Sequence, residues 1–261
     1  MEKAEMLRIT KQDGCLTLTL DRPEVGNAFD ARLVQCFGEA LDAAENDETV
    51  RAVVLAGAGK HFSAGADLGY MRAMRGAGRD ANHEDAVRTQ RLFAQVAEFP
   101  KPIVARVHGA ARGGGVGLVA AADVTVGSPE ASFAFTEVRL GIVPAIIAPF
   151  VLERLGPARS RRLFLTAETF SAADALAWGL LDVLVPATEL DQAVTKVTER
   201  LARGGPRALA EVKRLVHDVR YRDAAETAGL TAKRIAELRT GAEGQEGMTA
   251  FLEKRVPRWA R

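Results

Sequence analysis

The stretch HGAARGGGVGLVAAAD, residues 108–123, contains a run of three glycines, a further glycine two positions after that run, and no acidic side chain before Asp123. Its first two residues end the segment 102–109 (PIVARVHG), which predicts a strand, and the apolar residues after the glycines predict a short helix. One interpretation is close packing, because glycine lets a helix approach a strand. Two other interpretations give the bare backbone a chemical function.

The order of strand, glycine-containing loop and helix occurs twice in this chain. The first copy consists of a predicted buried strand at 51–57 (RAVVLAG), the loop 60–67 (KHFSAGAD) and a methionine-rich segment. The polar stretch 75–85 (RGAGRDANHED) then predicts a mobile segment before a helix that ends at Phe99. The chain therefore contains a weak internal repeat, of which the glycine run is the second copy.

The flanking segments predict an α/β fold with a helical tail. Leu7–Thr10 and Cys15–Leu20 predict a β-hairpin turned at Asp13-Gly14, because apolar and polar residues alternate on the second strand. From about Asp191 onward, the pattern is helical. The predicted helix caps and breaks are Asp30, Ser171 with Asp174, Gly204-Gly205-Pro206 and Gly241–Gly247.

A dinucleotide-binding loop is the first chemical interpretation of the glycine run. Residues 115–120 (GVGLVA) match G-x-G-x-x-[G/A], and Glu137 supplies an acid about 20 residues further on. However, residues 108–113 separate Val107 from Gly114, whereas the fingerprint opens directly from its strand. The helix before Asp123 is also too short for the usual crossover, so a nicotinamide-dependent oxidoreductase is a weak alternative.

An oxyanion site is the second chemical interpretation. A helix N-terminus leaves backbone N–H groups without partners and carries partial positive charge, and glycine lets a ligand approach those groups closely. Two such donors can hold an enolate or tetrahedral oxyanion. The repeat supplies a second loop, so the predicted donors are the N–H groups of Ala66 and Gly114.

At these residues the sequence resembles the enoyl-CoA hydratase/isomerase (crotonase) superfamily. The matching motifs occur in the family's order and run almost end to end. They are LDRPEVGNAF (20–29), FSAGADL (62–68), VHGAARGGG (107–115), FAFTEVRLGIVP (133–144), LTAETFSAADALAWGLLDVLVP (165–186) and MTAFLEKRVPRW (248–259).

The resemblance implies a crotonase-like spiral of ββα turns over residues 1–200, which holds the CoA and acyl site, and a C-terminal helical region over 201–261. The second region would build a homotrimer or a dimer of trimers. The implied substrate is an acyl-CoA thioester whose carbonyl oxygen lies between the N–H groups of Ala66 and Gly114. No further cofactor is implied, because coenzyme A belongs to the substrate.

The resemblance also implies a set of residues that contact CoA or the acyl chain. Tyr70 and Met71 belong to this set as lining of the acyl pocket, although core packing explains them equally well. Phe251 and Lys254 match a C-terminal pair that reaches the CoA of a neighbouring subunit. The other residues are Glu24, Val25, Ala64, Gly65, Asp67, Leu68 and Gly113.

Glu137 is the expected catalytic carboxylate. Standard hydratases of the family carry two glutamates, and their positions correspond to Gly117 and Glu137 in this chain, so only the second acid is present. A glutamate in a partly apolar pocket has a raised pKa and can move protons near neutral pH. The chain is thus expected to be a hydratase-type lyase, with a double-bond isomerase as the alternative and a non-catalytic CoA-ester-binding protein as a weaker one.

The finer resemblance favours hydration of a branched or dicarboxylic ester. FSAGADL followed by Tyr70-Met71, then GGGVGL and TEVRLG, is similar to bacterial methylglutaconyl-CoA and carboxygeranoyl-CoA hydratases, which serve leucine and acyclic terpene breakdown. A second substrate carboxylate could order a water where the missing acid would stand. Arg72, Arg75 and Arg139 are candidates to bind it, although surface solvation explains each of them better.

Composition excludes several other classes of protein. The 261 residues are 48% hydrophobic with a net charge of +1, which gives no electrostatic reason for a nucleic-acid or membrane partner. Two cysteines make no disulfide framework, and the scattered histidines have no metal-ligand spacing, so no metal is expected. With neither a signal peptide nor a membrane-spanning run, the sequence predicts a soluble, cytoplasmic protein.

Overall fold

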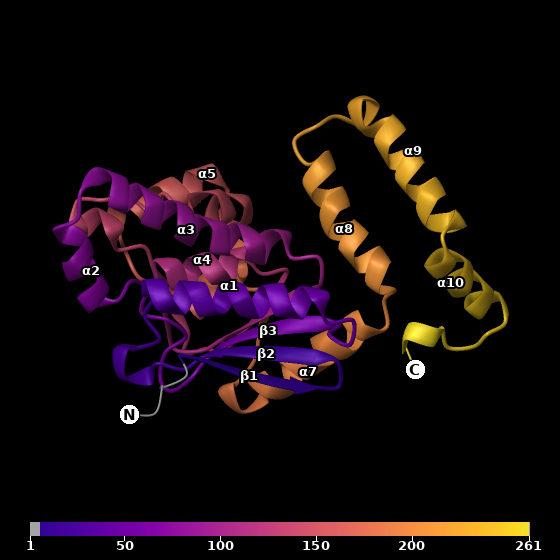
Figure 1. The fold of residues 1–261 in the computed structure, drawn as a ribbon, viewed down its shortest axis with the longest axis horizontal. Helices are drawn as coiled ribbons and strands as arrows, with labels where there is room; N and C mark the ends of the chain where they lie inside the picture. Colours follow the sequence, from indigo (N-terminus) through magenta and orange to yellow (C-terminus); the bar gives the residue numbers. More distant parts are fainter. Residues whose placement is uncertain (1–5, 261) are drawn as a thin grey trace.

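A computed structural model describes residues 6–260, and its centre is a six-stranded sheet in the order β1-β2-β3-β4-β6-β9 (Figure 1). β1 and β2 form the predicted antiparallel hairpin, and each other neighbouring pair in this sheet is parallel. The strands are β1 (Leu7–Gln12), β2 (Cys15–Leu20), β3 (Ala52–Gly57), β4 (Ile103–Val107), β6 (Val124–Gly127) and β9 (Val183–Leu184).

A second, small sheet connects the glycine run to the segment before Glu137. Its strands are β5 (Ala110–Arg112), β7 (Ser132–Ala134) and β8 (Phe170–Ser171). β5 pairs with β7 in parallel, and β7 pairs with β8 antiparallel. The predicted oxyanion loop and the predicted acid therefore leave adjacent strands of one sheet.

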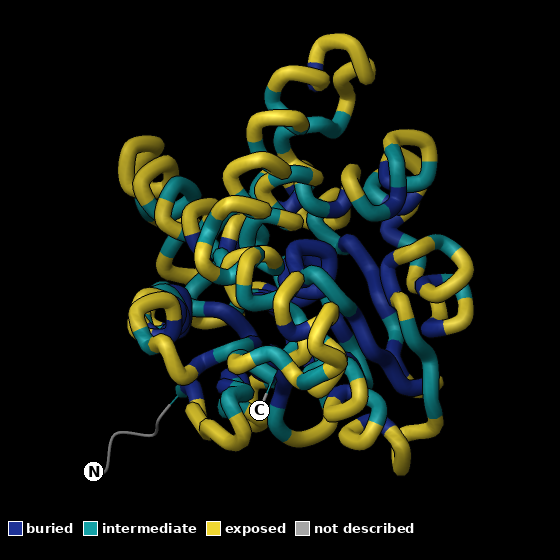
Figure 2. The backbone as a smooth tube through the Cα atoms, turned by 90° about the vertical axis from the view of Figure 1, so that its right-hand side faces the viewer, coloured by how far each residue is buried: buried dark blue, intermediate teal, exposed yellow. Residues whose placement is uncertain are grey.

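Helices cover both faces of the main sheet, and the buried backbone is concentrated in the middle of the molecule (Figure 2). Val53 and Leu55 of β3 pack in the core that also contains α1, whereas Val54 packs with Leu190 and Val194 of α7. This alternation is expected of a strand whose two faces are both covered. The helices are α1 (Ala31–Asn46), α2 (Leu68–Arg75), α3 (Arg79–Glu98), α4 (Gly114–Ala121), α5 (Ala148–Thr166), α6 (Ala172–Trp178), α7 (Leu190–Ala202), α8 (Pro206–Val219), α9 (Ala224–Thr240) and α10 (Ala242–Leu252).

The predicted helix caps are present. Asp30 Oδ1 accepts a hydrogen bond from the Leu33 N–H at 2.8 Å, and Ser171 and Asp174 form a reciprocal capping box. Each cap satisfies N–H groups that a helix cannot satisfy itself. They fix where α1 and α6 begin.

The helix start predicted after the polar stretch 75–85 is wrong, because α3 begins at Arg79 and includes most of that stretch. Its mobility stays a prediction. The amide of Asn82 donates to the carbonyl oxygens of Ala77 and Gly78, which closes the turn before the helix. These first turns face solvent, so they need no apolar stripe. Polarity here indicates exposure and not a lack of structure.

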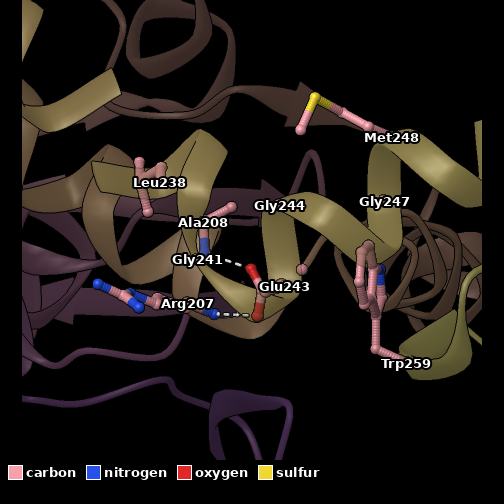
Figure 3. A pocket seen from close by; sticks show the side chains of 10 residues that line it. Arg207, Ala208, Leu238, Gly241, Glu243, Gly244, Gly247, Met248 and Trp259 are labelled. Carbon is pink, nitrogen blue, oxygen red and sulfur yellow. Dashed lines mark hydrogen bonds between the residues drawn. The ribbon is translucent and has the colours of Figure 1, made fainter. Parts of the chain in front are cut away.

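The C-terminal helices α8, α9 and α10 extend to one side of the sheet and its covering helices (Figure 1). Glu243 of α10 accepts hydrogen bonds from the N–H groups of Arg207 and Ala208, at 2.9 and 2.8 Å, and so caps α8 (Figure 3). The predicted break at Gly204-Gly205-Pro206 is confirmed. The break predicted over Gly241–Gly247 is confined to Gly241, because α10 begins at Ala242 and includes the rest of that segment. A further break between α8 and α9, at Arg220–Asp223, was not predicted; its signal is Asp223, which caps α9.

None of the helices within residues 6–260 combines the length and the apolar composition that crossing a bilayer requires. The division predicted between residues 200 and 201 stays a prediction. α7 crosses that boundary and ends at Ala202, two residues before the Gly204-Gly205 break.

Candidate active site

The loops after β3 and β4 lie against each other at one edge of the main sheet. Ser63 forms a parallel bridge with Ala111, in which the Ser63 N–H donates to Ala110 and the Arg112 N–H donates to Ser63. A Cβ at Gly65 would lie 3.0 Å from the Arg112 carbonyl oxygen, and Gly65 has φ +91°, which favours glycine. The two copies of the repeat therefore bring their glycine loops into contact.

Ala66 is held between two hydrogen bonds of its neighbours. The Phe29 N–H donates to Gly65 at 2.7 Å, and the Asp67 N–H donates to Phe29 at 2.9 Å. In parallel pairing, these bonds flank Ala66 and leave its own N–H on the opposite side of the segment. Within residues 6–260 the Ala66 N–H donates to no group.

Gly114 begins α4, and its N–H likewise has no acceptor in the described part of the chain. Gly113 precedes it with φ +45° and donates its own N–H to Ala134 of β7 at 3.0 Å. A Cβ at Gly114 would meet the Phe29 ring at 3.5 Å. Phe29 thus contacts both predicted donor segments, one through its backbone and the other through its ring.

Glu137 lies beside the same helix terminus. It begins the short 3-10 helix η2 (Glu137–Leu140), two residues after the buried Phe135, whose ring packs edge-on against Phe164. A Cβ at Gly113 would lie 2.9 Å from Glu137 Oε1, and Oε2 is buried without a hydrogen-bond partner among the described residues. Burial raises the pKa of the Glu137 carboxyl. This is the environment that a proton-transferring glutamate needs.

The space beside Gly117 is filled by apolar side chains. A Cβ there would overlap Ile147 Cγ2 and lie 2.9 Å from both Ile147 Cβ and Phe93 Cε1. An acidic side chain at position 117 would therefore displace Ile147, and the space next to Gly117 has no room for a water. The glycine is explained here by close packing, the first of the three interpretations.

We expect Gly117→Ala to lower the free energy of unfolding by about 1–3 kcal/mol, because it overpacks the contact with Ile147 and Phe93. Ile147→Ala alone leaves a cavity, and adding Gly117→Ala should fill part of it. The double variant should therefore lose clearly less stability than the two single losses added together, as measured by urea unfolding.

Gly229→Ala in the exposed part of α9 is the control, since no atom lies within 4 Å of a Cβ there. It should stabilise the protein slightly, because alanine favours helices by about 1 kcal/mol over glycine. Strict additivity at 117 and 147 would contradict the packing described.

Most of the residues implied for CoA and acyl contacts lie in η1, in the loop after β3 and at the start of α2, and of this set Gly65 and Gly113 are buried. Glu24 and Val25 are in η1 (Pro23–Val25), and the Ala64 N–H donates to the following Gly26 at 2.7 Å. Asp67 caps α2, which begins at the exposed Leu68. Tyr70 and Met71 follow in its first turn.

Tyr70 is half-buried and keeps a neutral phenol. Burial, together with the neighbouring Asp85 carboxylate, raises the pKa of Tyr70 well above its usual value. Its one hydroxyl hydrogen is directed at the Asp85 carboxylate of α3, so Tyr70 connects α2 to α3.

Phe251 and Lys254 are not brought to this site within one chain. Phe251 is 83% exposed near the end of α10, and Lys254 follows the helix with φ +54°. α10 and α2 lie at opposite ends of the molecule's long axis (Figure 1). A role for this pair at a CoA site requires a second subunit.

Two hollows elsewhere contain none of the predicted site residues. One, of about 960 Å³, lies between α8 and the ends of α3, α4 and α5. The other, of about 280 Å³, lies beside Glu243 and Trp259 in the helical tail (Figure 3). The candidate site is therefore defined by backbone and carboxylate geometry.

Three contributors to the site were not predicted from the sequence: Phe29, Ile147 and Phe93. Phe29 lies inside the LDRPEVGNAF motif, which was the available signal for it. Ile147 and Phe93 carried no such signal, because each acts by meeting a glycine of α4 across the fold.

This architecture, an α/β core with paired glycine loops and a helical C-terminal region, is the crotonase fold. The sequence pattern of the enoyl-CoA hydratase/isomerase family matches residues 10–261. The chain belongs to this family, which confirms the resemblance found in the motifs. The narrower methylglutaconyl-CoA branch stays a prediction.

Similar proteins of known sequence and structure agree with this family assignment. The chain is 35% identical over 267 residues to the carnitinyl-CoA dehydratase of Salmonella arizonae, covering 98% of each chain. It is 36% identical to an enoyl-CoA hydratase from Shewanella pealeana, with a TM-score of 0.95 over 99% of this chain and 97% of that one. An enoyl-CoA hydratase/isomerase from Marinobacter aquaeolei gives 36% identity and a TM-score of 0.93, over 98% and 99%.

Proposed function

We propose that the protein is a hydratase-type lyase that adds or removes water across the α,β double bond of an acyl-CoA thioester. The observation that carries this proposal is the Glu137 carboxylate, which has one oxygen against Gly113 and the other buried without a partner. The free N–H groups of Ala66 and Gly114 would bind the thioester oxygen on the other side of the reacting carbons. Such donors stabilise the enolate more than the ground-state carbonyl.

In hydration, the Glu137 carboxylate takes a proton from water as the water oxygen bonds to Cβ. The electron pair of the double bond moves through Cα to the thioester oxygen, where the two N–H groups hold the enolate. Cα then takes the proton from the Glu137 carboxyl as the carbonyl re-forms. One carboxylate serves as base and then as acid, so no second acid is needed.

Double-bond isomerisation is the alternative, and the packing at Gly117 favours it. With Ile147 and Phe93 against Gly117, Glu137 is the single carboxylate expected in the site. That is sufficient to remove a proton from Cα of a β,γ-unsaturated ester and return it at Cγ. The same enolate and the same N–H donors serve both reactions.

A branched or dicarboxylic acyl chain is the proposed substrate, with Tyr70 and Met71 lining its pocket. Arg72 and Arg75 are exposed on α2, and Arg139 already donates to the Ala167 carbonyl at 2.9 Å. Arg72 and Arg75 are thus the freer candidates for a second substrate carboxylate. Since the space beside Gly117 is closed, any ordered water must be held by Glu137 and the substrate itself.

The remaining assignments follow the family pattern. CoA would lie along Glu24, Val25, Ala64, Asp67 and Leu68, and no cofactor beyond this CoA is needed. A homotrimer or a dimer of trimers would bring the exposed Phe251 and Lys254 of one subunit to the CoA of another. A monomer in sedimentation analysis would contradict that assembly, and a cytoplasmic location stays a prediction.

A panel of esters tests the function: crotonyl-CoA, 3-methylcrotonyl-CoA, 3-methylglutaconyl-CoA and the β,γ-unsaturated 3-butenoyl-CoA. Mass spectrometry separates hydration, which adds one water, from isomerisation, which changes no mass but creates a conjugated thioester absorbance. We expect fastest hydration with 3-methylglutaconyl-CoA. Binding without turnover of all four esters would leave only a non-catalytic CoA-ester-binding protein.

A further inference from the structure

Arg22 connects Asp67, the residue after Ala66, to the segment 28–30 that pairs with Ala66. In the described part of the chain, its side chain bonds to neither Glu137 nor the glycine run. It lies between β2 and η1, and its side chain is only 13% exposed. One guanidinium nitrogen, Nη1, donates to the Ala28 carbonyl at 2.7 Å and lies 3.1 Å from Asp30 Oδ2. The other, Nη2, donates to Asp67 Oδ2 at 3.0 Å.

The two carboxylates that meet Arg22 each cap a helix with their second oxygen. Asp30 Oδ1 accepts from the first turn of α1. Asp67 Oδ1 accepts from the N–H groups of Gly69 and Tyr70 in α2, at 2.8 and 3.0 Å. A planar guanidinium can hold both carboxylates in fixed directions, which the point charge of lysine cannot do. Arg22 therefore links the starts of α1 and α2.

Ala66 lies directly before one of these linked points. Its orientation follows from the bonds that Phe29 makes with Gly65 and Asp67. Phe29 directly precedes the linked Asp30, and Asp67 is itself the other linked carboxylate. The ion pair with Arg22 opposes any shift of Asp67 along the segment that contains Phe29. The pairing of Ala66 with Phe29 thus sets the direction of the Ala66 N–H, and the ion pair between Arg22 and the adjacent Asp67 holds that pairing in place.

We propose that Arg22 is a positioning residue that acts through Asp67 to aim the Ala66 N–H at the thioester oxygen. This inference rests on the proposed function, in which that N–H is an oxyanion donor. Its effect belongs to the transition state, because a donor displaced by about 1 Å can cost up to 10²-fold in rate. A loss of this kind lowers kcat and leaves KM nearly unchanged.

Two variants test the inference from opposite ends of the ion pair. Arg22→Lys keeps the charge and loses the planar fork. Asp67→Asn keeps the cap of α2, since asparagine caps helices as well as aspartate does, and loses the charge on the Arg22 contact. The control is Arg8→Gln, which removes an exposed arginine paired with Asp21 in the same half of the chain.

Kinetics use the ester of the panel that turns over fastest, and infrared spectra use bound butyryl-CoA labelled with ¹³C at the carbonyl, which cannot be hydrated. We expect kcat to fall about 10–100-fold in Arg22→Lys and Asp67→Asn. KM should change less than about 3-fold. The carbonyl stretch should return toward its frequency in free ester, while Arg8→Gln matches the wild type in all three readouts.

The outcomes separate this inference from the proposed function. If both variants keep wild-type kcat, or lose kcat while the carbonyl stretch stays at its bound wild-type frequency, Arg22 does not position the donor. If the wild-type protein binds the ester without shifting its carbonyl stretch, the oxyanion site itself is wrong, and the inference falls with it. Thermal melting shows whether each variant is folded, and Asp67→Asn decides the question should Arg22→Lys unfold.

Discussion

Glu137→Gln should reduce turnover of the best ester by about 10²–10⁴-fold, the usual contribution of a positioned proton-transfer group. The amide has nearly the same shape as the carboxyl group but cannot take a proton from water or from Cα. Binding of butyryl-CoA should stay within a few-fold, because its contacts lie elsewhere. Steady-state kinetics and calorimetric titration measure the two effects separately.

The control for this variant is Glu130→Gln, at an exposed glutamate seven residues upstream whose side chain bonds to Ser128. It should leave turnover unchanged. Full activity of Glu137→Gln would remove Glu137 from the mechanism, and loss of ester binding in that variant would assign it a binding role in place of a catalytic one.

Glu137→Gln should also stabilise the protein at neutral pH. Burial raises the pKa of Glu137 in the folded state above its unfolded value, so the folded state favours the protonated form. Stability is therefore lost as pH rises from the unfolded pKa, about 4.5, through the folded one, and glutamine avoids this loss. Urea unfolding at pH 7 and pH 4 should show an advantage of Glu137→Gln at pH 7 that disappears at pH 4.

Gly114→Pro should lower kcat by about 10²–10³-fold, because it deletes one oxyanion donor. Gly114 is the first residue of α4, and proline is well tolerated at that position, where the missing N–H has no helical partner. The helix should therefore survive while the donor is lost. The shift of the carbonyl stretch in bound butyryl-CoA should shrink at the same time.

Gly114→Ala is the matched comparison, since it adds a side chain and keeps the N–H. A Cβ there meets Phe29 and Phe93 at an ordinary 3.5 Å, so its kcat should lie much nearer the wild type than that of the proline variant. Equal losses in both variants would mean that volume, and not the amide, matters at this position. Wild-type kcat in Gly114→Pro would exclude Gly114 as a donor.

Sequence signals within a few residues predicted the local structure well. Asp30, and Ser171 with Asp174, mark helix starts because their side chains bond to N–H groups within three residues. The sequence misled us where a polar composition was the only cue: residues 79–85 have no apolar stripe, yet they are helical. The turn at Arg220–Asp223 was missed because its one cue is the cap at Asp223.

The sequence alone also identified the family, and it predicted the two glycine loops and the one carboxylate of the site, since each belongs to a motif of fixed local spacing. Only the tertiary structure placed Glu137 against Gly113, filled the space at Gly117 with Ile147 and Phe93, and joined Asp30 to Asp67 through Arg22. These contacts join segments far apart in the chain, and their partners carry no local pattern. Close packing and ion pairing depend on which atoms meet in space, so only the tertiary structure shows these contacts.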